Sequence, residues 1–407
     1  MRKVVAPVVG ISFTEDHIKA VAVRPLPSGG VEVMQVATAP IPDASMQNGV
    51  ISDRLRIANA IRQLLLTSNI TAKNAVIGLP SRAVFARTVT IPPVPEAERR
   101  AVVRGEIDHL NILPPGQGTF DYVVFARPTG GGESGGTAVP GSEAASALAG
   151  KGEPVLFFAA EQHVAQDYWT VAHDAGLTVV GMEPSEYAAV RTVYPSLASR
   201  SLALAISVGA NNTHLQFLRD GLPVYARRLD VGIQQMSVPE VAVSATGEPG
   251  GWRMYGQEQE EEAAAARAAA EQFSPMSEKV AGTMFEDKSG RANAARQRLA
   301  QEIGRSIEYF GREYATDLTN LSSVLLPNDL NLAGLPIYVT AALEQEVDFS
   351  NAFESVQVPA GLNTRLLQEE GVAYAPALGL ALGQFGGNFA GLPVFNLSLE
   401  AAASSRF

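Results

Sequence analysis

The chain of 407 residues contains no cysteine. This absence excludes disulfide bonds, thiolate metal ligands and a cysteine nucleophile, and it fits a reducing compartment. Histidine is also scarce, because the five histidines show neither the HExxH motif nor the paired spacing of a zinc site. The G-x-S-x-G and Walker A patterns are absent as well, which disfavours a serine hydrolase and a P-loop nucleotide hydrolase.

Basic residues are in deficit. The chain has 31 Lys and Arg against 42 Asp and Glu, a formal net charge of −11. An acidic chain without a concentrated basic face is a poor candidate for nucleic acid, whose binding depends on neutralised phosphates. The cluster of Arg99, Arg100 and Arg104 is interpreted as an exposed helix face. We therefore predict no nucleic-acid partner.

Long hydrophobic runs are missing too. The apolar start of the chain is interrupted by the polar stretch Ser12–Lys19, well short of a signal peptide. Later apolar runs fall short of the ~18–20 residues that cross a bilayer. The 46% hydrophobic and 18% charged residues are ordinary globular composition, which excludes global disorder. We expect a soluble cytoplasmic protein of two or three domains.

Two stretches of the chain begin in the same way. Val4–Phe13 and Ile18–Arg24 predict a β-hairpin with a tight polar turn. Leu202–Val208 and Thr213–Arg219 predict a second hairpin of the same kind. Two copies of one strand–turn–strand unit, each opening half of the chain, indicate a duplicated architecture.

Composition divides the chain further. The stretch 129–153 is rich in Gly, Ala, Ser and Pro, and cannot bury enough apolar surface to order itself. Ala292–Tyr314 predicts an amphipathic helix, and Leu335–Ala341 predicts a strand. The predicted domains are a core of the first half (1–81), an inserted small unit (82–190) with a flexible loop (129–153), a second half (191–385) with an acidic Ala-rich insertion (243–290), and a C-terminal tail (386–407).

Several short motifs together resemble one family. The most specific are Ile77–Ser81, Phe85–Val89, Val102–Glu106 and Asp121–Val124, and supporting ones are Gly181–Pro184, Leu218–Gly221, Glu302–Tyr309 and Ala375–Leu382. On these motifs the chain resembles PilM, the family of actin-like cytoplasmic proteins of type IV pilus assembly, over nearly its whole length. The related FtsA family shares the architecture, but its likeness in the first motifs is weaker.

This resemblance implies an α/β protein with the actin-like ATPase fold. That fold has two ribonuclease-H-like halves, with a small α/β subdomain inserted in the first half and nucleotide bound between the halves. Phosphates lie against two hairpin turns, one from each half, whose backbone N–H groups point into the cleft. Each turn normally carries an aspartate that orients Mg²⁺ or the attacking water.

The chain departs from the family pattern at both turns. Ser12-Phe13-Thr14 replaces the D-x-G of the first turn, and Ser207 replaces the acid of the second, which keeps Gly209. Thr340 and two alanines stand where the family has a glycine pair. Because losing one catalytic electrostatic group costs ~10²–10³ in rate, we expect no hydrolysis and no catalytic or metal-binding residue.

ATP with Mg²⁺ is the cofactor that the family fold implies, and we expect no physiologically useful binding of it here. Ser12 and Ser207 have an alternative role as turn residues that bond their own backbone. The residues that the resemblance assigns to a nucleotide site are Ser12, Thr14, Glu183, Ser207, Gly209, Glu302, Arg305, Ser306 and Thr340.

The resemblance also implies a partner. It predicts a scaffold of the pilus assembly platform that binds the N-terminal cytoplasmic tail of a PilN-like bitopic inner-membrane protein, in a groove between the first-half core and the inserted unit. An extended peptide would place apolar side chains in this groove and bond along a strand. The groove residues predicted are Ile77, Leu79, Phe85, Arg87, Val103, Glu106, Ile107 and Leu110.

Other pilus platform and motor components, and self-association, are further predicted contacts, at a cytoplasmic location peripheral to the inner membrane. The C-terminal stretch Pro393–Leu399 contains an Asn-Leu pair that resembles the Asn-Leu-Leu-Pro segment of PilN tails. It would then occupy the groove in its own chain or in a neighbouring copy. The match is so short that chance is the favoured explanation.

Other functions stay open. One is a nucleotide-gated actin-like ATPase that controls pilus assembly, which ATP turnover would reveal. Another is an FtsA-like membrane-tethered filament protein, disfavoured because Ala401–Phe407 forms no basic amphipathic helix. A sugar kinase is the most distant, because no candidate catalytic base is visible.

Overall fold

The structure is a computed structural model. The described residues are 6–27, 29–124, 152–209, 211–236, 291–314, 316, 318–319, 321–327, 339–340, 347–349, 351–362, 371–385 and 391–398. The loop predicted at 129–153, apart from its last two residues, and the insertion predicted at 243–290 lie outside the described residues. Of the predicted tail, the structure describes residues 391–398.

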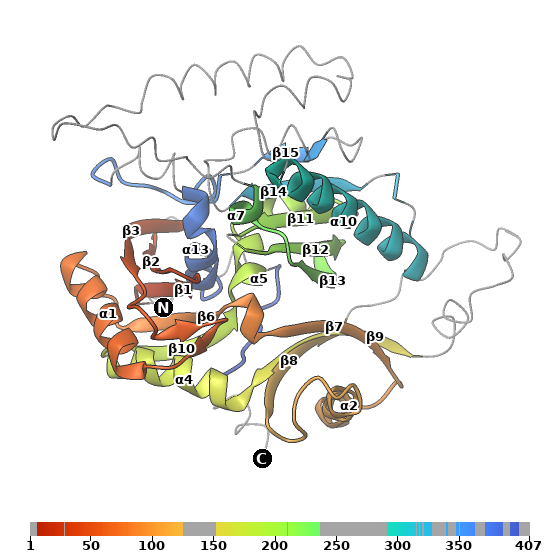
Figure 1. Cartoon of the computed structure of the whole chain (residues 1–407), viewed down its shortest axis with the longest axis horizontal. Helices are drawn as coiled ribbons and strands as arrows, with labels where there is room; N and C mark the ends of the chain where they lie inside the picture. Colours follow the sequence, from red (N-terminus) through yellow and green to blue (C-terminus); the bar gives the residue numbers. More distant parts are fainter. Residues whose placement is uncertain are drawn as a thin grey trace, which may run out of the picture.

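The first half is built on a five-stranded sheet in the order β10-β6-β1-β2-β3 (Figure 1). β1, β2 and β3 are antiparallel neighbours, and β6 and β10 run parallel to β1. All six residues of β1 are buried, as expected for a central strand with both faces covered. The strands are β1 (Val8–Phe13), β2 (His17–Pro25), β3 (Val31–Pro40), β6 (Asn74–Leu79) and β10 (Thr178–Pro184).

The second half repeats this sheet. Its order is β13-β12-β11-β14-β15, again with three antiparallel strands followed by two parallel ones. This repeated order and direction is that of two ribonuclease-H-like halves, so the predicted actin-like fold class is confirmed. The strands are β11 (Leu202–Val208), β12 (Thr213–Arg219), β13 (Leu222–Leu229), β14 (Ser322–Pro327) and β15 (Val347–Phe349).

Both predicted hairpins are present, because β1 pairs with β2 and β11 with β12. The sequence did not predict β14 or β15. The strand predicted at Leu335–Ala341 falls mostly outside the described residues, and the two residues described there, Val339 and Thr340, are helical.

Helices cover the sheets on both sides. α1 (Arg54–Thr67) and α4 (Gln162–Asp174) pack together beside the first sheet. α5 (Ser185–Val190) and α13 (Ala375–Leu382) lie between the two sheets, and every residue of α13 is buried. The shorter elements are β4 (Met46–Gln47), β5 (Val50–Ile51), η1 (Ser81–Ala83), α6 (Tyr194–Leu197), α7 (Ile233–Met236) and η2 (Gly371–Tyr374).

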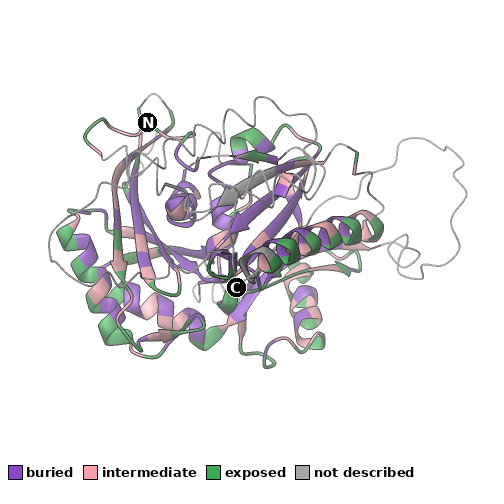
Figure 2. Ribbon diagram, turned by 45° about the horizontal axis from the view of Figure 1, so that its top comes forward, coloured by how far each residue is buried: buried purple, intermediate pink, exposed green. Residues whose placement is uncertain are grey.

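Two helices follow directly from their sequence. The side chain of Asp53 caps α1, because it accepts a hydrogen bond from the Arg56 N–H at 3.0 Å. α10 (Arg291–Glu313) matches the amphipathic helix predicted at Ala292–Tyr314, and buried and exposed residues alternate along it (Figure 2). None of the helices in the described part of the chain combines the length and hydrophobicity that a bilayer crossing requires.

The inserted unit has a sheet of its own, in the order β7-β9-β8. α2 (Glu96–His109) packs on it through Val103 and Ile107. The predicted range 82–190 is longer than this unit, because α4 packs on α1 and β10 pairs with β6 in the first sheet. The strands of the inserted unit are β7 (Phe85–Ile91), β8 (Gly118–Val124) and β9 (Glu153–Glu161).

Glycine lets α13 approach its neighbours at backbone distance. A Cβ atom on Gly10 of β1 would lie 1.9 Å from the carbonyl oxygen of Ala377, and one on Gly379 would lie 1.9 Å from that of Ala188 in α5. Both contacts are with backbone, which cannot swing aside like a flexible side chain. The packing of α13 between the halves therefore depends on these two glycines.

Gly379→Ala should lower the free energy of unfolding by about 3 kcal/mol or more, because α13 must move away from α5. Gly304→Ala is the matched control, since a Cβ there meets nothing within 4 Å and the residue lies inside α10. That change should stabilise the protein by about 0.5–1 kcal/mol. Denaturant unfolding of the two variants checks the difference, and equal midpoints would contradict this account of the packing.

Candidate functional site

A cleft lies between the halves where the two hairpin turns face each other. Its volume is about 390 Å³, and both turns line it. Glu15 of the first turn accepts a hydrogen bond from the Asn211 side-chain amide of the second turn, and it pairs with Arg82 at 3.1 Å. One carboxylate therefore bridges the two halves at the position where the family fold would place phosphates.

Three of the predicted nucleotide residues line this cleft: Ser12, Thr14 and Gly209. The Oγ of Ser12 is buried and has no hydrogen-bond partner among the described residues. The hydroxyl of Thr14 donates to Asp16 at 2.8 Å and accepts from the His17 N–H at 2.9 Å, so it closes its own turn.

The acidic side chains of the cleft already have partners. Besides Glu15 with Arg82, Asp16 accepts the Thr14 hydroxyl, and Glu186 accepts the Ser81 N–H at 3.3 Å. Burial raises the pKa of Glu186 to about 6. The described residues contain no group of three or more His, Asp or Glu side chains that could hold a metal ion.

The other predicted nucleotide residues lie elsewhere. On α10, Glu302 pairs with Arg227 of β13 at 3.0 Å and with Arg305 at 2.9 Å, and Ser306 accepts from Arg227 at 3.0 Å. Thr340 is not among the residues that line the cleft. The structure therefore brings together only the turn residues of the predicted set, and α10 forms an ion-pair network with β13 instead.

Glu183 takes part in a buried ion pair with Arg191. The Arg191 guanidinium lies 2.8 Å from the Glu183 carboxylate, with both side chains at most 1% exposed. Arg191 also donates to the carbonyls of Gly379 at 2.7 Å and Pro393 at 3.2 Å. Glu183 thus lies beneath the surface, where it joins β10 to α13 and to the C-terminal segment, and it does not line the cleft.

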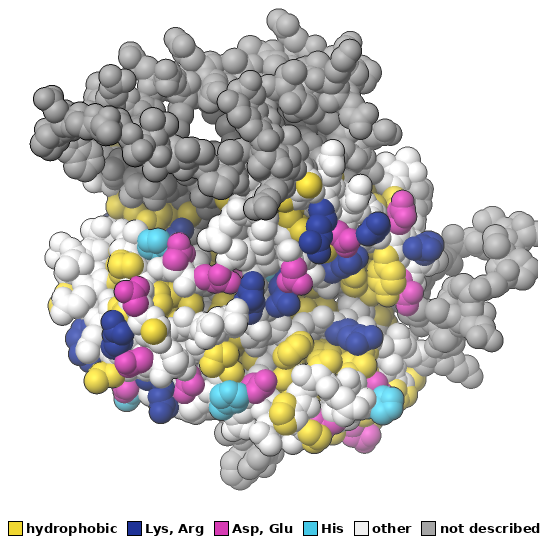
Figure 3. All heavy atoms as spheres, viewed as in Figure 1, with side chains coloured by type: hydrophobic (Ala, Val, Ile, Leu, Met, Phe, Trp, Pro, Cys, Tyr) yellow, Lys and Arg dark blue, Asp and Glu magenta, His cyan; other side chains and the backbone are white. Residues whose placement is uncertain are grey.

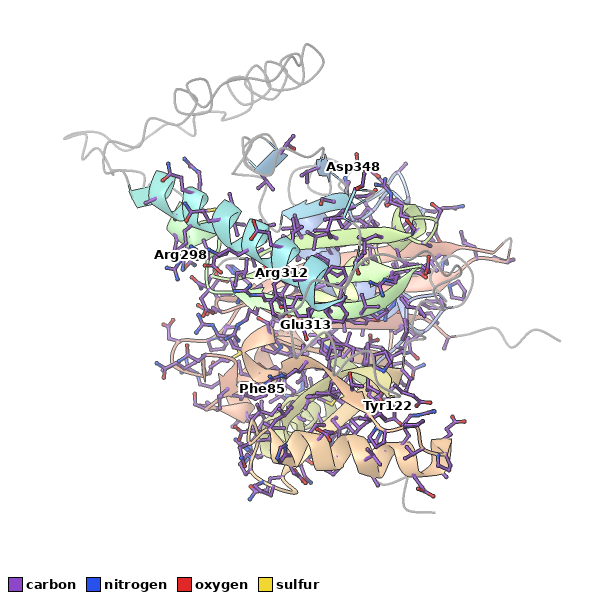
Figure 4. All side chains as sticks on the ribbon, turned by 90° about the vertical axis from the view of Figure 1, so that its right-hand side faces the viewer. Phe85, Tyr122, Arg298, Arg312, Glu313 and Asp348 are labelled. Atoms are coloured by element: carbon purple, nitrogen blue, oxygen red, sulfur yellow. The ribbon has the colours of Figure 1, made fainter. Side chains whose placement is uncertain are left out.

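A second cavity, of about 730 Å³, lies between the inserted unit and the second half. Phe85 and Arg87 of β7 form one wall, and Tyr225, Arg227 and Glu313 belong to the opposite one. Figure 4 shows Glu313 at the end of α10, on the side that faces Phe85. On the face seen in Figure 3, basic and acidic side chains are interspersed over the described residues. Ser207 also lines this second cavity.

Two of the eight predicted groove residues, Phe85 and Arg87, line this cavity. Ile77 and Leu79 are fully buried in β6 at the centre of the first sheet, and Val103 and Ile107 are buried in the core of the inserted unit. Glu106 and Leu110 lie half-buried on α2. The eight residues do not form one groove. Four of them are buried in two separate cores, that of the first half and that of the inserted unit.

An extended segment occupies a different groove. Residues 391–398, the tail segment, lie between the free edge of β10 and the edge strand β8, and Figure 1 shows them in dark blue below α5. The Leu397 N–H donates to the Met182 carbonyl at 2.8 Å. From β8, the Thr119 hydroxyl donates to the Leu397 carbonyl at 3.1 Å, and Asp121 accepts the Asn396 N–H at 2.8 Å. We call this seam the tail groove.

The tail groove also has an apolar pocket. The Phe395 ring is 1% exposed and lies against Phe158 of β9 and Tyr187 of α5, with ring centroids 4.6 and 4.8 Å away. Both aromatic partners also line the second cavity, so pocket and cavity adjoin. Leu397 is fully buried, whereas Val394 is 45% exposed. The pocket therefore selects Phe395 and Leu397.

Comparison with known proteins gives a match over nearly the whole chain. The chain aligns with the structure of a PilM–PilN type IV pilus biogenesis complex at a TM-score of 0.65 and 22% identity, covering 92% of this chain and 97% of that one. The chain has the PilM-like, actin-like fold. No protein-family model matches the sequence, and no curated protein matches it.

Two further matches have lower TM-scores. The ethanolamine utilization protein EutJ from Carboxydothermus hydrogenoformans aligns at 0.44 with 13% identity, over 93% of this chain and 90% of its own. MreB5 of Spiroplasma citri bound to AMPPNP also aligns at 0.44, with 10% identity, over 92% and 94%.

Sequence reasoning missed most walls of the tail groove in this PilM-like fold. Thr119, Phe158 and Tyr187 had no distinguishing pattern, because each reads as an ordinary residue of a buried strand or helix. Asp121 did carry a signal, since an acidic residue interrupts an apolar strand within a motif shared with PilM. Burial raises the pKa of Asp121, while the N–H groups of Asn396 and Tyr122 lower it in part.

His214 of β12 gives the protein a pH dependence. Burial, with a smaller effect of nearby Arg228, lowers the pKa of His214 to about 3, and its Nε2 atom has no hydrogen-bond partner among the described residues. Between about pH 6.5 and 3 the unfolded chain therefore binds a proton that the folded chain does not. Acidification through this window favours unfolding.

Between pH 6.5 and 4, acidification should lower the free energy of unfolding of the wild type by about 1 kcal/mol per pH unit more than that of His214→Gln. Urea unfolding across this range checks the slope. Glu186, whose raised pKa acts in the opposite direction, is unchanged in both proteins and cancels from the comparison. His109→Gln, at the exposed end of α2, is the control and should follow the wild type. Parallel curves for wild type and His214→Gln would contradict the assignment.

Proposed function

We propose that the protein is a scaffold of a type IV pilus assembly platform and binds the N-terminal cytoplasmic tail of a PilN-like bitopic inner-membrane protein. The observation that carries this proposal is the tail groove, which already accepts an extended segment through main-chain hydrogen bonds and an apolar pocket. The match to a PilM–PilN complex over nearly the whole of both chains supports the nature of the partner.

The chemistry of the tail groove suits such a peptide. Met182 offers a main-chain N–H and carbonyl on the free edge of β10, and Thr119 and Asp121 offer a donor and an acceptor from β8. Strand edges recognise the backbone of an extended peptide, and pockets for alternate side chains provide specificity. A bitopic partner would hold the scaffold at the inner membrane from the cytoplasmic side. Further platform and motor components, and self-association, belong to the same proposal.

The interdomain cleft is, in this proposal, a degenerate nucleotide site. Neutral hydroxyls at positions 12 and 207 replace the carboxylates that would hold Mg²⁺. Among the described residues, the Oγ atoms of Ser12 in the cleft and of Ser207 in the second cavity have no partner and supply no charge. Of the acids that line the cleft, Glu15 pairs with Arg82, Asp16 accepts from Thr14, and one oxygen of Glu186 accepts the Ser81 N–H. The Glu15 carboxylate would also repel phosphate. These residues do not fit Mg-ATP, so the activity proposed here uses the fold as a scaffold.

Mg-ATP or Mg-ADP at millimolar concentration should leave the melting temperature of the wild type unchanged. A ligand at about 100 times its dissociation constant stabilises by ~2.7 kcal/mol, which a thermal-shift titration detects. Ser12→Asp/Ser207→Asp should gain a shift, and the neutral pair Ser12→Asn/Ser207→Asn is the control. A clear shift, or ATP turnover, in the wild type would favour the nucleotide-gated ATPase instead.

A synthetic peptide of about 15 residues from the N-terminus of a PilN-like protein should bind the full chain. The variants are compared in a chain whose tail segment is weakened by Phe395→Ala, because the tail segment itself bonds to Thr119 and Asp121. In this background Asp121→Asn should weaken peptide binding about tenfold, because the peptide N–H then meets a neutral acceptor. Thr119→Val should weaken it about fivefold, while Thr90→Val, an exposed threonine on β7 of the same sheet, should not. Isothermal calorimetry measures all four proteins, each with Phe395→Ala. Equal affinities throughout would place the peptide outside the tail groove.

A further inference from the structure

We propose that the tail segment is a built-in competitor, which occupies in its own chain the groove that the partner peptide needs and must leave before that peptide binds. The regulation of partner binding rests on the function proposed above, but the exchange of the tail segment itself does not. The tail groove then has a closed state, in which the tail segment fills it, and an open state, in which the partner peptide can bind.

The walls of the tail groove are held without the tail segment. β10 pairs with β6 from Thr178 to Pro184, and β8 pairs with β9 from Gly118 to Val124. Each wall is therefore an edge strand of a complete sheet, with its register set by its own neighbour. The tail segment adds to these edges and belongs to neither ladder. Its departure would open the groove without breaking a strand pair.

The hold on the tail segment is of the kind that a second peptide can replace. Three hydrogen bonds hold its backbone. The Leu397 N–H donates to the Met182 carbonyl, the Leu397 carbonyl accepts from Thr119, and the Asn396 N–H donates to Asp121. The Met182 N–H donates to the Asn396 side-chain oxygen at 3.4 Å. The remaining recognition is the burial of Phe395 and Leu397. The groove thus fits any extended peptide with an apolar residue, Asn and a second apolar residue in succession.

The first residues of the tail segment make contacts of their own with the body of the protein. A Cβ on Gly391 would lie 2.3 Å from the Tyr194 hydroxyl, so only glycine passes this point. Pro393 then accepts hydrogen bonds from Tyr187 at 2.9 Å and from Arg191. These contacts guide a segment of the same chain into the groove, whereas a free peptide needs only the positions of Phe395, Asn396 and Leu397.

A tethered competitor acts through its effective concentration. A segment that belongs to the same chain as its site is present there at an effective concentration on the order of millimolar. A free peptide with the same intrinsic affinity as the tail segment occupies half of the grooves only when its concentration exceeds this effective concentration. Weakening the tail segment should therefore tighten the apparent binding of a free peptide by about tenfold or more.

The test uses the full chain and a fluorescently labelled synthetic peptide of its own residues 391–398. Phe395→Ala removes the anchor of the tail segment and leaves every wall residue in place. Val394→Ala is the matched control, since that neighbouring side chain is exposed. Fluorescence anisotropy should show the peptide binding to Phe395→Ala at least about tenfold more tightly than to wild type and Val394→Ala.

A second measurement keeps the test decisive if Phe395→Ala fails to fold, which circular dichroism and thermal melting report. In the wild type, an excess of the same unlabelled peptide should speed hydrogen exchange at the amides of Asn396 and Leu397, because it displaces the tail segment. Unchanged exchange at saturating peptide would overturn the inference. So would equal peptide binding by wild type and a folded Phe395→Ala, since the tail segment would then be a fixed part of the core.

Two controls separate this inference from the others. A wild-type dimer that Phe395→Ala abolishes would assign the tail segment to the groove of a second copy and overturn the proposal. If the chain's own peptide binds Phe395→Ala but a PilN-like peptide binds no variant, the exchange stands and the proposed partner is wrong. If a PilN-like peptide binds wild type and Phe395→Ala equally, the partner stands and the competition is refuted.

Discussion

The buried pair of Arg191 and Glu183 holds the parts of this protein together. Removing two charges from water costs several kcal/mol each, which only close geometry and full hydrogen bonding offset. Arg191 lies close to Glu183 of β10 and donates to the carbonyl of Gly379 in α13 and that of Pro393 in the tail segment, while its Nε and the Oε1 of Glu183 have no hydrogen-bond partner among the described residues. An element that moved away would leave a buried charge short of partners. The first sheet, α13 and the Pro393 end of the tail segment therefore meet around one guanidinium.

This arrangement explains where the tail groove lies. An open sheet edge presents unpaired N–H and carbonyl groups that invite another strand. Here β10 and β8 are both edges, and they face a common seam that the tail segment fills. The pair beneath the seam anchors Pro393, while the seam itself reads Asn396 and Leu397. Attachment at one end and recognition at the other make a segment that stays near its groove even when it is displaced.

The interdomain cleft and the tail groove are two separate sites of one fold. The actin-like halves persist with their repeated strand order, yet Ser12 lines the cleft where the family pattern has an acid, and Glu15 spans the gap to Asn211. Electrostatic groups at the reacting atoms supply most of such catalysis, and it is on this ground that we propose a degenerate nucleotide site in the cleft. The sites rich in specific contacts lie instead around the inserted unit, where edge strands and aromatic side chains meet.

The sequence by itself determined the local elements: both hairpins, the amphipathic α10 and a set of motifs that predicted the fold. These depend on residues within a few positions of each other, so spacing and turn chemistry reveal them. Only the tertiary structure decided that β10 joins the first sheet, that Glu183 faces Arg191, and that Thr119, Asp121 and Tyr187 surround the tail segment. Parallel pairing and the contacts of the tail segment join residues far apart in the chain, and Glu183 and Arg191, eight positions apart, are buried by elements distant in sequence, so no local pattern records which partner each one meets.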